Sequence, residues 1–178
     1  VKNLYRDKIR EIDAATASFG QGIAVTPLQM VMSYAAIANG GVLMKPYLVK
    51  EVIDSNGNKT VLTPKPVRRV ISQTSSDTIR AMLVKVVENG HAKAAGVKGY
   101  YVGAKTGTAQ IPAPKGGYLE DQYIHTVVGI APADKPRFAM LVKLERPEGI
   151  KFAEASAAPL FGEIAEFLLK YYQVPKQY

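Results

Sequence analysis

The sequence predicts an α+β fold in which an antiparallel sheet is flanked by helices on both faces. The second half of the chain contains three consecutive segments with strand character, at 100–110, 123–130 and 137–144. The last two are joined by a short loop over 131–136, so they are expected to form an antiparallel hairpin. Both are nearly continuous apolar runs, which is typical of strands buried on both faces. Such a sheet needs helices on each side, and we expect a single core in these 178 residues.

The first helix is predicted to follow an irregular lead-in over residues 1–25. Thr26 is a suitable N-cap, Pro27 is favourable at the first helical position, and Gln29 can complete a capping box. The glycine pair that begins at Gly40 is expected to end this helix. Its apolar residues at helical spacing are Leu28, Val31, Ala35 and Ala38.

Short strands and turns are predicted next. Residues 44–53 are interpreted as one extended piece, 55–58 as a turn, and 59–62 as a strand that pairs back. Pro64 and Pro66 are expected to keep the following piece irregular.

A second helix is predicted over 76–89. Thr74 or Ser75 is the expected N-cap, and Gly90 is expected to end the helix. Its predicted core face consists of Ile79, Met82, Leu83 and Val86.

The last helix is expected to begin near Ser156 and to accommodate Pro159 in its first turn. Its predicted core face consists of Leu160, Ile164, Leu168 and Tyr171. We interpret the apolar faces of both helices as core rather than as partner surfaces.

Composition excludes several functions. Without cysteine there is no disulfide, no thiol catalysis and no thiolate metal site. No apolar run reaches about 18 residues, so any membrane contact is expected through an anchor in a longer parent chain. The net charge of +8 comes from scattered basic residues and is interpreted as a solvated surface. Attraction to anionic cell-wall polymer or lipid is the alternative. Nucleic-acid binding is disfavoured, because no basic stripe is interleaved with aromatic residues.

Histidines and carboxylates do not suggest a metal site, and no cofactor is expected. His91 and His125 have no second ligand nearby at metal-binding spacing. His125 is predicted to be a hydrogen-bonded core histidine. Glu145, Glu148 and Glu154 flank a loop and are expected to be solvated.

The most informative motif is Lys105-Thr106-Gly107, within the strand predicted over 100–110. It resembles one of three signature motifs of the serine acyl-transferases that bind penicillin, the others being Ser-x-x-Lys and Ser-x-Asn. None of the seven serines has Lys three residues on or Asn two residues on, and no tyrosine begins Tyr-x-Asn. The chain is therefore predicted to carry one wall of an active site and to lack its nucleophile.

The motif has a chemical rationale on a strand. Side chains alternate, so Lys105 and Gly107 are expected on one face, and Thr106 and Thr108 on the other. A lysine facing a serine cluster supplies positive charge and can relay protons. The glycine lets a substrate lie against the strand edge. Backbone N–H groups beyond it can stabilise an oxyanion, and the hydroxyls can bind a carboxylate.

The wider pattern resembles the class B penicillin-binding proteins. The matching stretches are 18–29, 36–41 with Pro46, 102–110, 129–132 and the strand that begins at Arg137. The resemblance covers almost the whole chain and implies part of a penicillin-binding/β-lactamase-like transpeptidase fold. Residues 1–178 would be the C-terminal part of a single transpeptidase domain, and the missing N-terminal half would supply two further strands. The implied activity is D,D-transpeptidation, which cross-links peptidoglycan stem peptides and is blocked when β-lactam antibiotics acylate the enzyme. The implied location is the extracytoplasmic face of the bacterial cytoplasmic membrane.

The resemblance also implies roles for individual residues. Lys105 resembles the lysine of the third motif, which faces the nucleophile. Thr106 and Thr108 resemble the hydroxyls that hold a substrate carboxylate, with Gly107 between them. The Thr108 backbone N–H resembles half of an oxyanion hole, and Gln110 resembles a residue that lines the groove.

Other functions remain open at this stage. A D,D-carboxypeptidase or β-lactamase would use water as the acceptor, but the stretch over 20–29 argues against it. A non-catalytic penicillin-binding-like scaffold or β-lactam sensor would keep the fold without the nucleophile. Whether the chain is an enzyme by itself is therefore uncertain.

Overall fold

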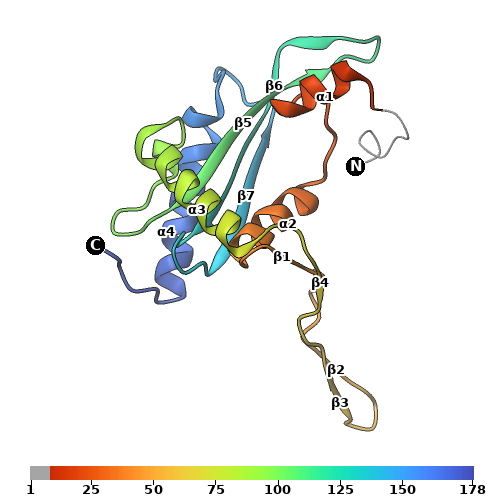
Figure 1. Ribbon diagram of the computed structural model, residues 1–178, viewed down its shortest axis with the longest axis vertical. Coiled ribbons are helices and arrows are strands. Elements are labelled where there is room, and N and C mark those ends of the chain that lie inside the picture. Colours follow the sequence, from red (N-terminus) through yellow and green to blue (C-terminus); the bar gives the residue numbers. More distant parts are fainter. Residues whose placement is uncertain (1–8) are drawn as a thin grey trace.

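The computed structural model describes residues 9–178 and is built around a three-stranded antiparallel sheet (Figure 1). The strands are β5 (Gly103–Pro112), β6 (Tyr118–Ala131) and β7 (Phe138–Glu145). β6 lies between the other two and pairs with both, which confirms the predicted β6–β7 hairpin. β6 begins earlier than predicted, because the β5–β6 hairpin continues as far as the pairing of Pro112 with Tyr118.

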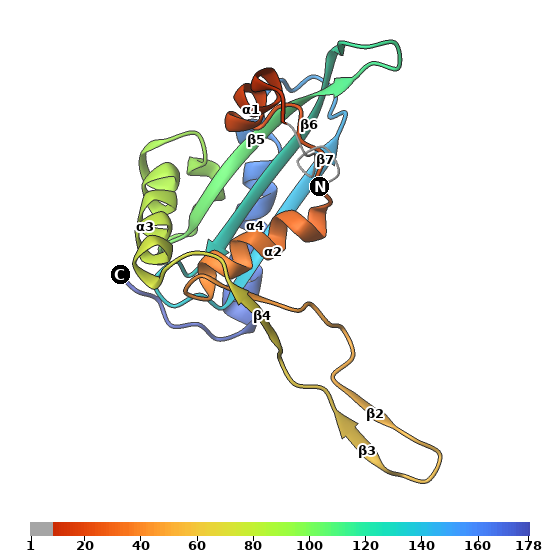
Figure 2. The same ribbon diagram turned by 45° about the vertical axis from the view of Figure 1, so that its right-hand side comes forward.

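Helices cover both faces of this sheet, as predicted (Figure 2). They are α2 (Pro27–Ala38), α3 (Gln73–Asn89) and α4 (Ala157–Tyr171). A Cβ built at Gly103 would lie 3.0 Å from Leu83 of α3, whereas one at Gly129 would lie 2.8 Å from Phe161 of α4. Gly129 pairs with Ala104, the residue after Gly103, so α3 and α4 lie on opposite faces. The α+β architecture is therefore confirmed.

The core is centred on β6 and on the close approach of α4. Residues 127–131 of β6 are all buried, as expected for a strand covered on both faces. A Cβ at Gly129 would lie 2.7 Å from the Gly103 carbonyl oxygen as well as 2.8 Å from Phe161. Only glycine leaves room here for the Phe161 ring to reach the sheet. In contrast, the apolar residues of β7 are mostly half-buried, so burial on both faces is wrong for that strand.

The face predicted for α4 is partly wrong, although Ile164 packs against the core. Leu160 and Tyr171, which were expected in the core, are exposed. The buried residues are Ala157, Ala158, Phe161, Gly162, Ala165 and Leu169. A seam of small residues lets the helix pack closely, as at Gly162, where a Cβ would lie 2.6 Å from the Ala94 carbonyl oxygen. Other bulky residues of the helix lie on its outer side, where Phe167 and Tyr171 stack with ring centroids 6.1 Å apart.

The other helices follow local capping signals with two differences. α2 has the predicted capping box, with hydrogen bonds of 3.1 and 2.9 Å between Thr26 and Gln29. α3 begins earlier than predicted, because Ser72 is its N-cap. Its buried face is shifted too, since Leu83 is buried and Met82 is exposed.

Helix α1 (Glu11–Ser18) lies where an irregular lead-in was predicted. The helix buries no residue. Because it has no buried face, its sequence has no apolar periodicity from which a helix could be predicted. The lead-in prediction for residues 1–8 lies outside the described residues. Two short 3₁₀ turns complete the helical elements, η1 (Lys93–Ala95) and η2 (Ala153–Ala155).

A long β-arm extends from the body between α2 and α3 (Figure 2). Its strands are β1 (Val42–Met44), β2 (Glu51–Ile53), β3 (Lys59–Val61) and β4 (Pro66–Arg69). The β2–β3 hairpin confirms the predicted turn and the returning strand. The extended piece predicted over 44–53 is instead interrupted between β1 and β2, and the segment predicted to be irregular contains β4. Pro66 is tolerated because β4 pairs on one side only, with β1.

Truncation of Phe161 tests the close packing of α4. Phe161→Ala removes a fully buried ring and is expected to lower the free energy of unfolding by about 3–5 kcal/mol. Phe167→Ala on the same helix is the control, because that ring is 64% exposed, and it should change the free energy by no more than about 0.5 kcal/mol. Denaturant unfolding of both variants in one background measures the difference. Equal losses of unfolding free energy in the two variants would mean that Phe161 does not hold α4 against the sheet.

Candidate functional site

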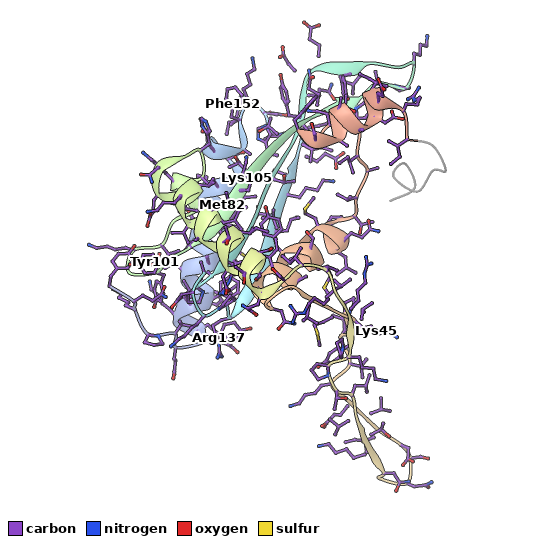
Figure 3. All side chains as sticks on the ribbon, viewed as in Figure 1. Lys45, Met82, Tyr101, Lys105, Arg137 and Phe152 are labelled. Atoms are coloured by element: carbon purple, nitrogen blue, oxygen red, sulfur yellow. The ribbon has the colours of Figure 1, made fainter. Side chains whose placement is uncertain are left out.

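The predicted site residues lie on β5, which is one of the two edge strands of the sheet in the described part of the chain. In Figure 3, Lys105 lies between Phe152, toward one end of the sheet, and Arg137, toward the other. Strand pleating places the Lys105 side chain on the face of Gly103 and α3, and the Thr108 side chain on the face of α4. The alternation that the sequence predicted is therefore present.

The polar groups of the backbone alternate as well. Lys105 Nζ donates to the Thr106 carbonyl oxygen at 2.7 Å, so that carbonyl lies at the open edge of β5. The Gly107 carbonyl instead accepts a hydrogen bond from the Thr126 hydroxyl of β6, at 3.4 Å. Because residues two apart on a strand direct their backbone groups to the same side, the Thr108 N–H also points to the open edge. A donor is thus available there for a ligand oxygen.

A cross-strand pair holds the segment between β7 and α4 against the sheet. Thr108 of β5 and His125 of β6 are direct partners and share one face. The Thr108 hydroxyl oxygen accepts a hydrogen bond of 3.2 Å from the buried Ala153 N–H. The hydroxyl proton of Thr108 therefore stays available for another acceptor.

His125 is a hydrogen-bonded core histidine, as predicted. It is fully buried, and its two ring nitrogens lie 2.8 Å from the Ser156 hydroxyl and 3.1 Å from the Lys151 carbonyl oxygen. A carbonyl can only accept, so Nε2 carries a proton, and in the neutral ring Nδ1 then accepts from Ser156. His125 and Thr108 thus fix residues 151–156 as a wall beside the open edge of β5.

This wall and β5 enclose a cavity of about 300 Å³. It contains three of the predicted site residues together with residues from the wall and from the segment after α3. The lining residues are His91, Lys105, Thr106, Thr108, Phe152, Ala153 and Glu154. Another cavity, of about 240 Å³, lies between α3 and Tyr178 and contains none of the predicted site residues.

One hydrogen-bonded pair joins lining residues that come from two segments of the chain. His91 Nδ1 lies 2.9 Å from Glu154 Oε2, with side chains 85% and 45% exposed. Glu145 and Glu148 are exposed, as predicted. Over residues 9–178, no group of three or more His, Cys, Asp or Glu side chains is arranged to hold a metal ion.

Two predicted site residues do not line the cavity. Gln110 is exposed farther along β5, opposite Tyr123. Gly107 leaves space for the Thr126 side chain of β6, because a Cβ there would lie 2.5 Å from the Thr126 hydroxyl oxygen. Sequence reasoning did not identify His91, Phe152, Ala153 and Glu154 as site residues. No local signal marks them, since the segment after α3 and the β7–α4 connection reach β5 only in the folded chain.

The Thr108–Ala153 contact can be tested by removing the hydroxyl. Thr108→Val leaves the buried Ala153 N–H without an acceptor and is expected to lower the free energy of unfolding by about 1–3 kcal/mol. Thr108→Ser keeps the hydroxyl and should retain most of the stability. Denaturant unfolding measures the loss, and faster amide exchange at Ala153 in the valine variant alone would locate it. A valine variant as stable and as protected as the parent would contradict the contact.

Comparison with known proteins gives consistent matches. Residues 3–166 match the family model described as the penicillin binding protein transpeptidase domain. Stage V sporulation protein D of Bacillus subtilis is 43% identical over 161 residues, which are 89% of this chain and 25% of that protein. Peptidoglycan D,D-transpeptidase FtsI of Escherichia coli is 36% identical over 171 residues, 94% of this chain and 27% of that protein. The chain thus spans about a quarter of the length of these relatives.

Solved structures share the fold. Penicillin binding protein 3 of Mycobacterium tuberculosis, in complex with aztreonam, matches with a TM-score of 0.83 and 39% identity over 92% of this chain and 39% of that one. The transpeptidase domain of penicillin-binding protein 3 from Burkholderia pseudomallei matches with a TM-score of 0.78 and 32% identity, over 95% of this chain and 49% of that one. The three strands and their helices are therefore part of a transpeptidase fold.

Proposed function

The chain belongs to the class B penicillin-binding protein transpeptidase family, and we propose that residues 1–178 are the C-terminal part of the transpeptidase domain of a serine D,D-transpeptidase. The observation that carries this proposal is the Lys105-Thr106-Gly107 motif on an open strand edge beside a cavity. Penicillin binding protein 3 of Mycobacterium tuberculosis, which shares this fold, has been crystallised with aztreonam and with ampicillin, and this supports a β-lactam as a ligand of the same site.

The proposed reaction is an acyl transfer in two steps. A serine hydroxyl supplied by residues outside this sequence attacks the carbonyl between the two D-alanines of a stem peptide. The peptide bond breaks, D-alanine leaves with the serine proton, and an ester remains. An amine of a second stem peptide then attacks the ester, and the serine regains its proton. A β-lactam would acylate the same serine through opening of its ring.

Lys105 would hold positive charge beside the nucleophile. Its ammonium has three protons, and two are directed at Thr106, to the carbonyl oxygen at 2.7 Å and to the hydroxyl oxygen at 3.5 Å. These bonds keep the ammonium at the edge where a ligand would lie, while the third proton remains available. The Thr108 N–H at the same edge would stabilise the oxyanion together with a second donor from the nucleophile's own segment.

The threonine hydroxyls would bind the carboxylate of the substrate. Both Thr106 and Thr108 line the cavity, and Thr108 retains a proton to donate because its oxygen accepts from Ala153. Gly107 would allow the peptide to lie close to β5. Gln110 would line the groove farther along the strand.

We place the protein at the extracytoplasmic face of the bacterial membrane, where peptidoglycan is cross-linked. Among residues 9–178 no helix combines the length and apolar character needed to cross a bilayer. The alternatives are a D,D-carboxypeptidase or β-lactamase relative, with water as acceptor, and a non-catalytic scaffold or β-lactam sensor that lacks an intact Ser-x-x-Lys. Sequencing the gene on either side of this stretch distinguishes the non-catalytic alternative from an enzyme.

The 178-residue chain by itself is expected to form no covalent adduct with penicillin. None of its seven serines stands in a Ser-x-x-Lys motif, so no hydroxyl has the neighbouring base that acylation needs. Intact-mass measurement after incubation with benzylpenicillin decides the point, and the complete protein serves as the positive control. A stoichiometric adduct on any of the seven serines would contradict the proposal that the nucleophile lies outside these 178 residues.

Lys105→Ala in the complete transpeptidase domain is expected to slow acylation at least about tenfold. The variant removes one charge-assisted contact, worth roughly 1.5–3 kcal/mol, and each 1.36 kcal/mol is about tenfold in rate. Stopped-flow acylation by benzylpenicillin measures the change. Lys115→Ala is the matched control, since Lys115 is an exposed lysine in the β5–β6 connection. Acylation at the parent rate in Lys105→Ala would refute the role assigned to Lys105.

A further inference from the structure

We propose that Glu154 binds a primary ammonium group of the ligand and so makes the site selective for the charge that the ligand carries there. This inference rests on the proposed function of the same cavity. Glu154 is the only carboxylate among the residues that line it, and Lys105 is the only lysine. The lining therefore presents one negative and one permanently positive side chain to a single ligand.

The position of Glu154 is fixed by its neighbour. Ala153 is fully enclosed, and its N–H is held by the Thr108 hydroxyl at 3.2 Å. His125 holds the carbonyl of Lys151, on the other side of Phe152, at 3.1 Å. The backbone that carries Glu154 is thus tied to β5 and β6, so its carboxylate keeps one place relative to the Lys105 motif.

The side chain of Glu154 is held from the other side by His91. Glu154 Oε2 lies 2.9 Å from His91 Nδ1, and a carboxylate can only accept, so Nδ1 carries the proton. No hydrogen-bond donor in the described part of the chain contacts Oε1, which leaves an acceptor for a ligand. His91 is therefore a positioning residue, and Glu154 is the residue that meets the ligand.

The charge pattern defines the ligand. A molecule complementary to this lining has a carboxylate near Lys105 and the threonine hydroxyls and an ammonium near Glu154. The Phe152 ring lies beside Glu154 in the lining and already attracts a cation, since Lys151 Nζ lies 5.9 Å from its centroid. Both a stem peptide with a free side-chain amine and a β-lactam with an amino side chain have this chemistry.

Penicillins that differ in side-chain charge test the proposal in the complete transpeptidase domain. Ampicillin carries an ammonium, carbenicillin a carboxylate, and benzylpenicillin neither. Because Glu154 is partly exposed, Glu154→Gln is expected to slow acylation by ampicillin roughly two- to fivefold. It should slow acylation by benzylpenicillin less than acylation by ampicillin, and it should speed acylation by carbenicillin. The ampicillin-to-carbenicillin rate ratio should therefore fall, and the fall should shrink at high salt.

Two controls separate charge from structure. Glu148→Gln removes an exposed carboxylate from the same β7–α4 connection but outside the cavity, and it should leave the ratio unchanged. His91→Ala should reduce the ratio less than Glu154→Gln, because it frees the carboxylate without removing it. An unchanged ratio in Glu154→Gln, or an equal fall in Glu148→Gln, would overturn the proposal. If none of the three penicillins acylates the parent domain, the proposed function itself fails.

A peptide pair identifies the natural source of the ammonium. A peptide ending in D-Ala-D-Ala, with its side-chain amine either free or acetylated, competes with labelled benzylpenicillin for the parent domain. The free amine should compete better in the parent, and Glu154→Gln should remove that advantage. Equal competition by the two peptides in the parent would contradict a role in substrate recognition and leave Glu154 a determinant of β-lactam preference alone.

Discussion

The cross-strand pair of Thr108 and His125 is the contact on which the candidate site depends. Each residue holds the β7–α4 connection at a different point, Thr108 through the Ala153 N–H and His125 through Ser156 and the Lys151 carbonyl. Without these bonds the connection would be an ordinary solvent-exposed loop. With them it becomes a wall that encloses the edge of β5. The cavity therefore depends on two side chains of the sheet face opposite to that of Lys105, and one of them, Thr108, also lines the cavity.

Close packing of α4 supports this wall. Gly129 lets the Phe161 ring reach β6, and the helix begins directly after Ser156, which His125 holds. A bulkier residue at Gly129 would lift the first turn of α4 from the sheet and with it the segment that carries Phe152 and Glu154. The same small residues that set the helix depth explain why its face was predicted wrongly. Periodicity methods weight large apolar side chains, whereas alanine and glycine decide which side of this helix can approach.

Local chemistry made part of the molecule predictable. The capping box of α2 and the turn of the β-arm depend on residues a few positions apart, so the sequence alone was sufficient. Helix α1 was not predicted because it buries no residue. The start of α3 was predicted too late because Ser72, Thr74 and Ser75 can all serve as N-caps. In the site, Lys105 to Thr108 were found through a motif within one strand. Glu154 and His91 belong to segments that come together only in the tertiary structure. No spacing of residues in the sequence indicates this contact.

The two outer edges of the sheet differ in chemistry. This difference indicates which edge would contact the proposed remainder of the domain. The edge of β5 presents a lysine, two threonines and a backbone donor, which suits a polar ligand. The edge strand β7 has a mostly apolar sequence and half-buried side chains, and α4 exposes Leu160, Phe167 and Tyr171 on its outer surface. An unpaired edge of an apolar strand and an exposed apolar helix face favour association with further structure. Since the chain spans about a quarter of its relatives, the proposed remainder of the domain would cover these surfaces and leave the β5 edge free for the ligand.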